Sequence, residues 1–180
     1  MKKLLMFLVL SVFASTGMLR AEEMKMAYVD VEKVFNEYDT TKQNDAKLKE
    51  EGKAKTTERA TYVDEIKKLK EEAELLSEEA KKEKETVIEG KLKALREFDE
   101  KAKGELRSKR DFLLKKIFDD IKVTIEQIGK DGKYTIIFND RALLYKSEAL
   151  DITAEVIKKM NAKAKQDASK KKEAAPAEAQ

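Results

Sequence analysis

The fold of this 180-residue chain is decided by the stretch TYVDEIKKLKEEAELLSEEA, residues 61–80. Its apolar residues follow one another at steps of four and three, at Tyr62, Ile66, Leu69, Ala73, Leu76 and Ala80. This heptad spacing predicts a helix with one narrow apolar seam, wide enough to bury against a single partner helix. Between residues 64 and 85, 15 of 22 residues are charged, so the remaining helix surface is predicted to stay in water.

A second seam follows in the same proline-free segment, whose apolar positions are Leu92, Leu95, Ala102, Leu106, Leu113, Ile117, Ile121, Ile125 and Ile128. Between the two seams, residues 86–90 combine β-branched side chains with a glycine, which predicts a break. Residues 41–129 are therefore predicted to form an antiparallel helical hairpin, an arm with helices of about 40 residues and roughly 60 Å each. One continuous helix in a parallel coiled coil is the alternative.

The segments on either side of the arm are predicted to form short strands and helices. Residues 25–29 predict a strand, and Asp30 predicts the N-cap of a short helix that follows it. After the arm, residues 134–138 and 142–145 predict two strands joined by a turn, and Asp151 predicts the cap of a last helix. The fold class is thus α+β and mostly α.

Two separated segments, residues 22–40 and 130–162, are predicted to form one small β-containing body, with a disordered tail over residues 163–180. A core of about fifty residues is marginal alone, and a three-stranded sheet has two open edges. The body is therefore predicted to join several copies of the chain. The candidate oligomerisation residues are Tyr28, Val29, Ile136, Phe138, Leu144 and Tyr145.

The N-terminus has the pattern of a bacterial signal peptide, predicted over residues 1–21. A basic start, Lys2 and Lys3, precedes an apolar run of roughly ten residues, too short to span a bilayer. Cleavage after Ala21 or after Gly17 fits, and an uncleaved interfacial anchor is the alternative. Removal of residues 1–21 lowers the formal charge from +3 to zero, with 36 bases against 36 acids. Net charge therefore does not favour a nucleic-acid partner.

Composition also argues against an enzyme. The chain has no cysteine and no histidine, which removes thiol nucleophiles, imidazole bases and the usual zinc ligands. Carboxylates and lysines are so numerous that no pair stands out, and no glycine-rich phosphate loop is present. We expect no catalytic residue, no cofactor and no metal site.

The two ends of the chain resemble the Skp (OmpH-like) periplasmic chaperones. The resemblance rests on AYVDVEKVF at residues 27–35, GKY at 132–134, LLY at 143–145, ALDIT at 149–153 and VIKKMN at 156–161. It implies a homotrimer joined through the body, with three arms around a cavity that holds unfolded outer-membrane proteins without ATP. It also implies contact with lipopolysaccharide or anionic lipid, although the neutral mature charge departs from the basic family pattern.

Two sets of arm residues are candidates for such contacts. Val63, Leu75, Phe98 and Phe112 lie off the main seam and are candidate client-binding residues, with packing against a neighbouring helix or plain exposure as the alternative. Arg96, Lys103, Arg107 and Arg110 follow at spacings of seven, four and three, which predicts one basic stripe. The stripe could meet anionic lipid or acidic client segments, or be a solvated face paired to acids across the hairpin.

The function predicted from these observations is a periplasmic holdase that keeps exported outer-membrane proteins from aggregating. A structural coiled-coil scaffold of the cell envelope is the alternative. A nucleic-acid-binding protein, suggested only by local lysine and arginine density, is the weakest of the three.

Overall fold

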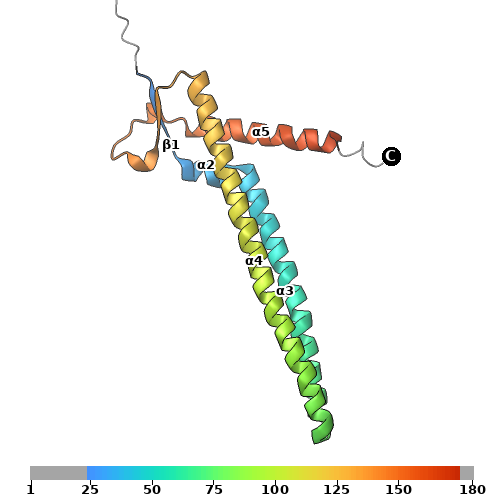
Figure 1. Cartoon of the computed structure of the whole chain (residues 1–180). Coiled ribbons are helices and arrows are strands. Elements are labelled where there is room, and N and C mark those ends of the chain that lie inside the picture. The colour runs from blue at the N-terminus through green and yellow to red at the C-terminus, as the bar shows by residue number, and fades with distance from the viewer. Residues whose placement is uncertain (1–23, 175–180) are drawn as a thin grey trace, which may run out of the picture.

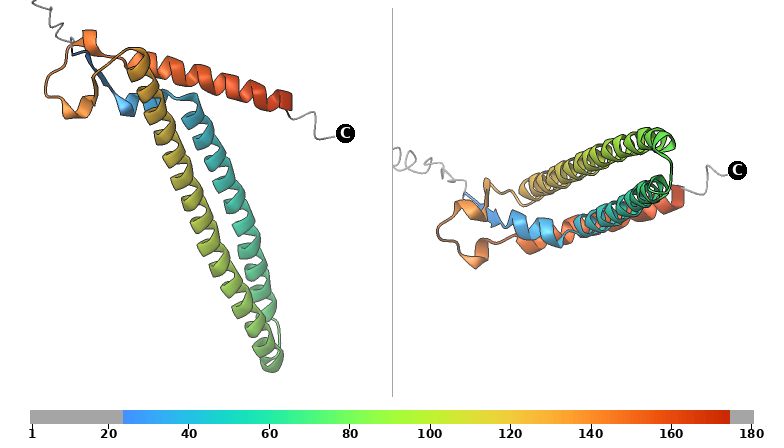
Figure 2. Two further views of the ribbon diagram at one scale, coloured as in Figure 1. Left: turned by 45° about the horizontal axis from the view of Figure 1, so that its top comes forward. Right: turned by 90° about the horizontal axis from the view of Figure 1, so that it is seen from below.

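The computed structural model describes residues 24–174, with side chains described to residue 170, and shows a long arm on a small body (Figure 1). The arm is an antiparallel hairpin of α3 (Asp39–Ala73, 35 residues) and α4 (Glu78–Asp131, 54 residues). At 1.5 Å per residue these helices span about 52 and 81 Å. The two helices stay side by side in every view (Figures 1 and 2). The predicted hairpin and the mostly helical fold class are confirmed.

The turn of the hairpin lies at residues 74–77, so the break predicted at residues 86–90 is wrong. Ser77 has the extended backbone of an N-cap, and Glu78 and Glu79 follow in the first turn of α4, where carboxylates favour the positive end of the helix dipole. Ile88 lies inside α4 and is buried as a seam residue. Its β-branched side chain therefore packs across the hairpin and does not interrupt the helix.

The outer half of the arm is held by a small apolar cluster. Ile66 and Ala73 of α3 pack against Ile88 of α4, and the half-buried Leu69, Leu92 and Leu95 cover them. The predicted seam of residues 62–80 is thus correct as far as Ala73. Beyond it the chain turns, and Leu76 is 42% exposed.

The middle of the arm is held by ion pairs between its two helices. Lys55 Nζ lies 3.4 Å from Glu105 Oε2, Arg59 Nε lies 2.9 Å from Asp99 Oδ1, and Lys109 pairs with Glu51. Two further cross-hairpin pairs, Lys91 with Glu65 and Lys84 with Glu72, lie nearer the turn. These pairs connect the two helices along the length of the arm.

The body contains a two-stranded parallel sheet of β1 (Met26–Val29) and β2 (Ile136–Asn139), in which Met26 pairs with Ile136 and Val29 with Asn139. The whole arm is the connection between these strands, which lets them run parallel. The predicted strand at residues 142–145 is wrong. Asn139 Oδ1 accepts a hydrogen bond from the Arg141 amide and begins a 3₁₀ turn, η2 (Asp140–Ala142). The other edge of β1 instead forms a single bridge, Tyr28 to Asp151.

Two predicted helix caps are confirmed. Asp30 Oδ1 accepts a hydrogen bond from the Lys33 amide at 2.8 Å and begins α2 (Val31–Glu37). Asp151 Oδ1 accepts one from the Thr153 amide at 2.8 Å, just after η3 (Glu148–Leu150) and at the start of α5 (Thr153–Ala174).

The core of the body draws on every one of these segments. Five almost completely buried residues belong to one apolar cluster: Val29 of β1, Val34 of α2, Ile128 of α4, and Val156 and Met160 of α5. Ile117 and Ile121 of α4 belong to the same cluster. The last turns of α4 are therefore part of the body core, although the sequence assigned residues 41–129 to the arm.

Helix α5 runs on to Ala174 and projects away from the body (Figure 1). Residues 163–174 are thus helical and not disordered as predicted. None of the helices in the described range is long and apolar enough to cross a membrane. The predicted signal peptide, residues 1–21, lies outside the described residues, as do residues 175–180.

Candidate functional site

Three of the four candidate client-binding residues are exposed on the arm. Leu75 stands in the turn with 88% of its surface exposed, Phe112 of α4 is 67% exposed, and Val63 of α3 is 39% exposed. Val87 of α4, which the sequence reasoning missed, is about half exposed. The arm around these side chains is densely charged, and Leu75 is followed by Leu76, which is 42% exposed. The arm therefore offers small apolar contacts among charged residues.

The fourth candidate, Phe98, packs inside the hairpin. Its ring centroid lies 5.2 Å from that of Tyr62 on α3, and Lys55 Nζ lies 5.5 Å from the Phe98 ring centroid. For Phe98 the structure therefore matches the alternative reading, packing against a neighbouring helix. The pattern could not separate it from Phe112, because the two are 14 residues apart and occupy equivalent positions of the heptad.

The predicted basic stripe of Arg96, Lys103, Arg107 and Arg110 is exposed along α4. It is not paired across the hairpin: Arg107 and Arg110 approach Asp111 of their own helix, at 3.9 and 3.3 Å. Lys103, Arg107 and Arg110 surround a shallow hollow of about 450 Å³, whose floor is Leu48 of α3 and Leu106 of α4. This arm hollow, lined by Leu48, Lys103, Leu106, Arg107 and Arg110, combines apolar surface with positive charge.

The candidate oligomerisation residues divide into a buried pair and an exposed set. Tyr28 and Val29 are buried within the single chain. The four others form an exposed body patch, comprising Ile136, Phe138, Leu144 and Tyr145, of which Leu144 is 108% exposed. Met24, Met26 and Leu150 are exposed in the same body but were missed. Met26 lies in β1 itself, and all three residues line one hollow of the body.

Charged groups fix the loop that carries Leu144 and Tyr145 over β1. Lys146 Nζ lies 3.0 Å from Asp140 Oδ2 and 4.9 Å from the centroid of the buried Tyr28 ring. The hydrogen bond to Asp140 raises the pKa of Lys146, and burial raises the pKa of Tyr28. Burial by itself would raise the pKa of Asp151, but hydrogen bonds from Thr153 outweigh it, and the pKa is lowered.

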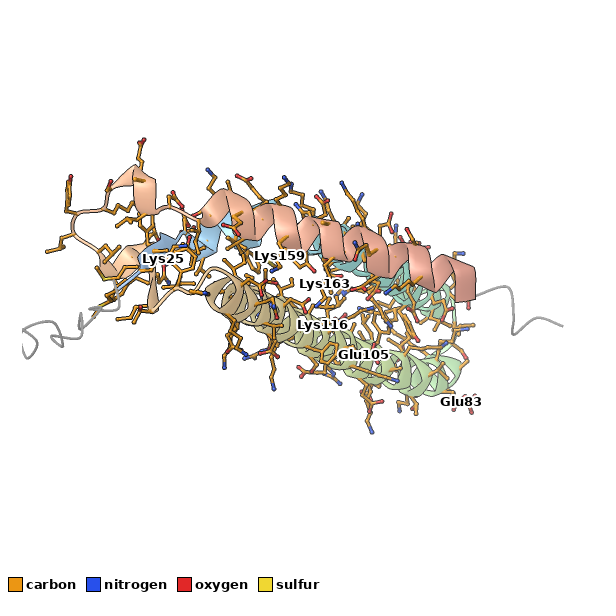
Figure 3. The ribbon with its side chains drawn as sticks, turned by 90° about the horizontal axis from the view of Figure 1, so that it is seen from above. Lys25, Glu83, Glu105, Lys116, Lys159 and Lys163 are labelled. Atoms are coloured by element: carbon orange, nitrogen blue, oxygen red, sulfur yellow. The ribbon has the colours of Figure 1, made fainter. Side chains whose placement is uncertain are left out.

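A second pairing joins the end of α4 to α5. Lys159 Nζ lies 2.9 Å from Asp131 Oδ2, and the Gln127 amide donates to Asp131 Oδ1 at 2.7 Å. These hydrogen bonds lower the pKa of Asp131. Figure 3 shows Lys159 and Lys163 of α5 on the side of that helix where α4 passes. The arm is thus anchored to the last helix by charge as well as by the core.

The residues that the structure describes hold no group of three or more acidic side chains placed to bind a metal ion. The arrangement of the described residues into a body and an arm defines a class of protein. A small mixed body carries one long antiparallel helical arm (Figure 2). The arm is densely charged and exposes large apolar side chains such as Leu75 and Phe112.

Comparison with known proteins agrees with this class. The family model described as outer membrane protein (OmpH-like) matches residues 25–160. The chain therefore belongs to the OmpH-like family.

Two individual proteins are similar to it. The fold is similar to that of a crystal structure from Caulobacter crescentus CB15, provisionally described as an outer-membrane chaperone (OmpH-like). The TM-score is 0.72 at 14% identity, over 82% of this chain and 90% of that one. An uncharacterised protein of Aquifex aeolicus (strain VF5) is 31% identical over 90 residues, which are 50% of this chain and 56% of that protein. The chain thus spans little more than half the length of this relative.

Proposed function

We propose that this protein is an ATP-independent holdase chaperone of the periplasm. It would bind unfolded outer-membrane proteins after export and prevent their aggregation on the way to insertion. Family membership and the chaperone description of a structural neighbour support a chaperone-type role. The observation that carries the finer proposal is the densely charged arm, on which large apolar side chains such as Leu75 and Phe112 are exposed.

The physical reason concerns how an unfolded barrel strand aggregates. Such a strand exposes alternating apolar residues and open backbone edges, which pair with other strands. Isolated apolar contacts are individually weak, so a client would be covered by many of them and released without an energy source. The role needs neither catalysis nor a cofactor.

The proposal is tested by diluting a urea-unfolded outer-membrane β-barrel protein into buffer that contains this protein at near-stoichiometric ratio. We expect light scattering by the client to be suppressed. The variant Leu75→Ser/Phe112→Ser should need several-fold more protein for the same effect, whereas Ser108→Ala, an exposed polar site on α4, should match the parent chain. Failure of the parent chain to keep any such client soluble would favour the envelope scaffold.

We further propose a homotrimer that is joined through the body. The exposed body patch and the outer edge of β2, which pairs with no other strand among residues 24–174, support association there. Light-scattering mass during chromatography should give three copies, and Leu144→Ser/Tyr145→Ser should lower that mass. A parent chain that elutes as a clean monomer or dimer would contradict the trimer.

Localisation and lipid contact stay predictions. The periplasm follows from the predicted signal peptide together with family membership, and fractionation of cells that express the full chain would test it. For anionic lipid or lipopolysaccharide, flotation with anionic vesicles should be reduced by Arg107→Glu/Arg110→Glu if the basic stripe makes the contact.

A further inference from the structure

The arm tip, residues 71–79, combines strong negative charge with exposed leucines. These nine residues contain five glutamates and no base. Leu75 and Leu76 lie in the turn, and neither belongs to the apolar cluster that closes this end of the hairpin. A turn needs no apolar residue for its own geometry, so the two leucines are available for contact with another surface.

The arm hollow has the opposite charge. Residues 101–111 contain five bases and two acids. Glu105 faces Lys55 of α3, and Asp111 lies 3.9 Å from Arg107 and 3.3 Å from Arg110, so the net charge stays positive. Lys103 lies within ion-pair distance of no carboxylate in the part of the chain whose side chains are described. The floor of the hollow, Leu48 and Leu106, is half-buried, so it can accept a small apolar side chain.

We propose that the arm tip of one copy docks in the arm hollow of a second copy. Leu75 and Leu76 would cover Leu48 and Leu106, and the tip glutamates would meet Lys103, Arg107 and Arg110. This inference goes beyond the proposed function, since the contact needs no client. The occupant is a second copy because this chain itself carries the acidic, leucine-bearing surface that the hollow fits.

Antiparallel arms satisfy both contacts at once. About 30 residues of α4 separate the turn from the hollow, which is roughly 45 Å along the helix. This separation is the same in both copies, so one two-fold axis seats each tip in the other copy's hollow. Two weak contacts made together bind far more tightly than either alone.

The geometry is distinct from association through the body. Arms that leave a shared body side by side place their tips next to one another. Each tip is then roughly 45 Å from every arm hollow of the same assembly. A contact between tip and hollow therefore reports pairing of arms from different assemblies. Because it depends on opposite charges at the surface, it weakens with salt.

Cysteine cross-linking tests the contact directly, because the chain has no cysteine of its own. A Ser77→Cys chain is mixed with a tagged Lys103→Cys chain, which keeps Arg107 and Arg110. The matched control partner is a tagged Ser108→Cys chain, whose new thiol lies two residues beyond Leu106 and so points about 200° away from it. At low salt we expect the Ser77→Cys chain to form a disulfide with the Lys103→Cys chain at least about fivefold faster than with the Ser108→Cys control. This difference in rate should disappear near 1 M salt, where surface charges are screened. Equal rates, or no disulfide with either partner, would overturn the proposal.

A charge exchange supplies the second readout. Arg107→Glu/Arg110→Glu in the Lys103→Cys chain should slow the disulfide at least about fivefold. Glu74→Lys/Glu78→Lys in the Ser77→Cys chain should then restore the rate, because opposite charges face one another again. The proposal would be wrong if both charge variants left the rate of disulfide formation unchanged while Glu74→Lys/Glu78→Lys weakened client retention. In that case the tip would be a client contact only.

Discussion

The body and the middle of the arm use different forces to hold helices together. In the body, Ile128 of α4 lies among Val34, Val156 and Met160, and water is excluded. In the middle of the arm, α3 and α4 are joined by the Tyr62–Phe98 ring contact and by ion pairs such as Lys55 with Glu105, whose side chains stay 35% and 49% exposed. Exposed ion pairs contribute little to stability, whereas buried apolar side chains contribute most of it. The body should therefore be rigid, and the arm should open locally at lower cost.

The largest expected effect is in the body. Ile128→Ala removes a fully buried side chain from the centre of the core and should lower the free energy of unfolding by about 2–5 kcal/mol. Val63→Ala, at a half-exposed position of α3, is the matched control in the arm and should cost less than about 0.5 kcal/mol. Urea unfolding followed by circular dichroism measures both. Equal costs would remove the distinction between the two regions.

A smaller effect is expected at the outer cluster of the arm. Ile88→Ala should cost about 2 kcal/mol, near the low end for such a truncation, because two helices can close on the cavity more easily than a full core. Hydrogen exchange should show faster exchange on both sides of the turn, with the body amides unchanged. Faster exchange throughout the body would mean that arm and body unfold as one unit.

The cap of α5 connects body stability to pH. Burial opposes the charged form of Asp151, but hydrogen bonds from Thr153 prevail and lower the pKa of Asp151 below its ordinary value of 3.8. The charged carboxylate therefore stabilises the fold fully above that value, and this contribution is lost as the pH falls through the lower folded-state pKa. Asp151→Ala should cost about 1 kcal/mol at pH 7. Asp151→Asn keeps a capping oxygen and should cost less, and its stability should fall less between pH 5 and pH 2. If the Asp151→Asn variant lost as much stability between pH 5 and pH 2 as the parent chain, this role of Asp151 would be contradicted.

The smallest effect is expected at the ion pairs of the mid-arm. Asp99→Asn breaks the pair with Arg59 and should change stability by about 0–1 kcal/mol, less at high salt. Lys55→Leu/Glu105→Leu replaces an ion pair by apolar contact and should make the arm exchange more slowly. If Asp99→Asn destabilised the protein as much as Ile128→Ala, charge would be the dominant force in the arm.

Much of the fold could be predicted from local signals. The heptad steps around Ile66 predicted the hairpin, and Asp30 and Asp151 predicted two helix starts, because caps and seams depend on a few neighbouring residues. The position of the turn could not be found in this way. Helix breakers are absent from residues 74–77, and the glycine that suggested a break, Gly90, has open space around it within α4.

The turn position also decided which site residues meet. A turn near residue 88 would have placed Tyr62 opposite residues around 114, whereas the observed turn places it against Phe98. The packing of Phe98 and the exposure of Phe112 both follow from which residues of α3 lie opposite which residues of α4. No local sequence pattern predicts this register. The strand error at residues 142–145 has a similar origin, because β1 was already paired with β2 and bridged to Asp151.

The pairing of β1 with β2 has a consequence for how the chain is made. Met26 pairs with Ile136, 110 positions later in the sequence, and the core that they cover also needs Met160. During synthesis the hairpin can form from its own turn outward, since its contacts lie within one continuous segment. The first strand has to wait until nearly the whole polypeptide has emerged. Until then a newly made copy is itself an incomplete chain with uncovered apolar residues, and it would need the same protection from aggregation that we propose it gives to others.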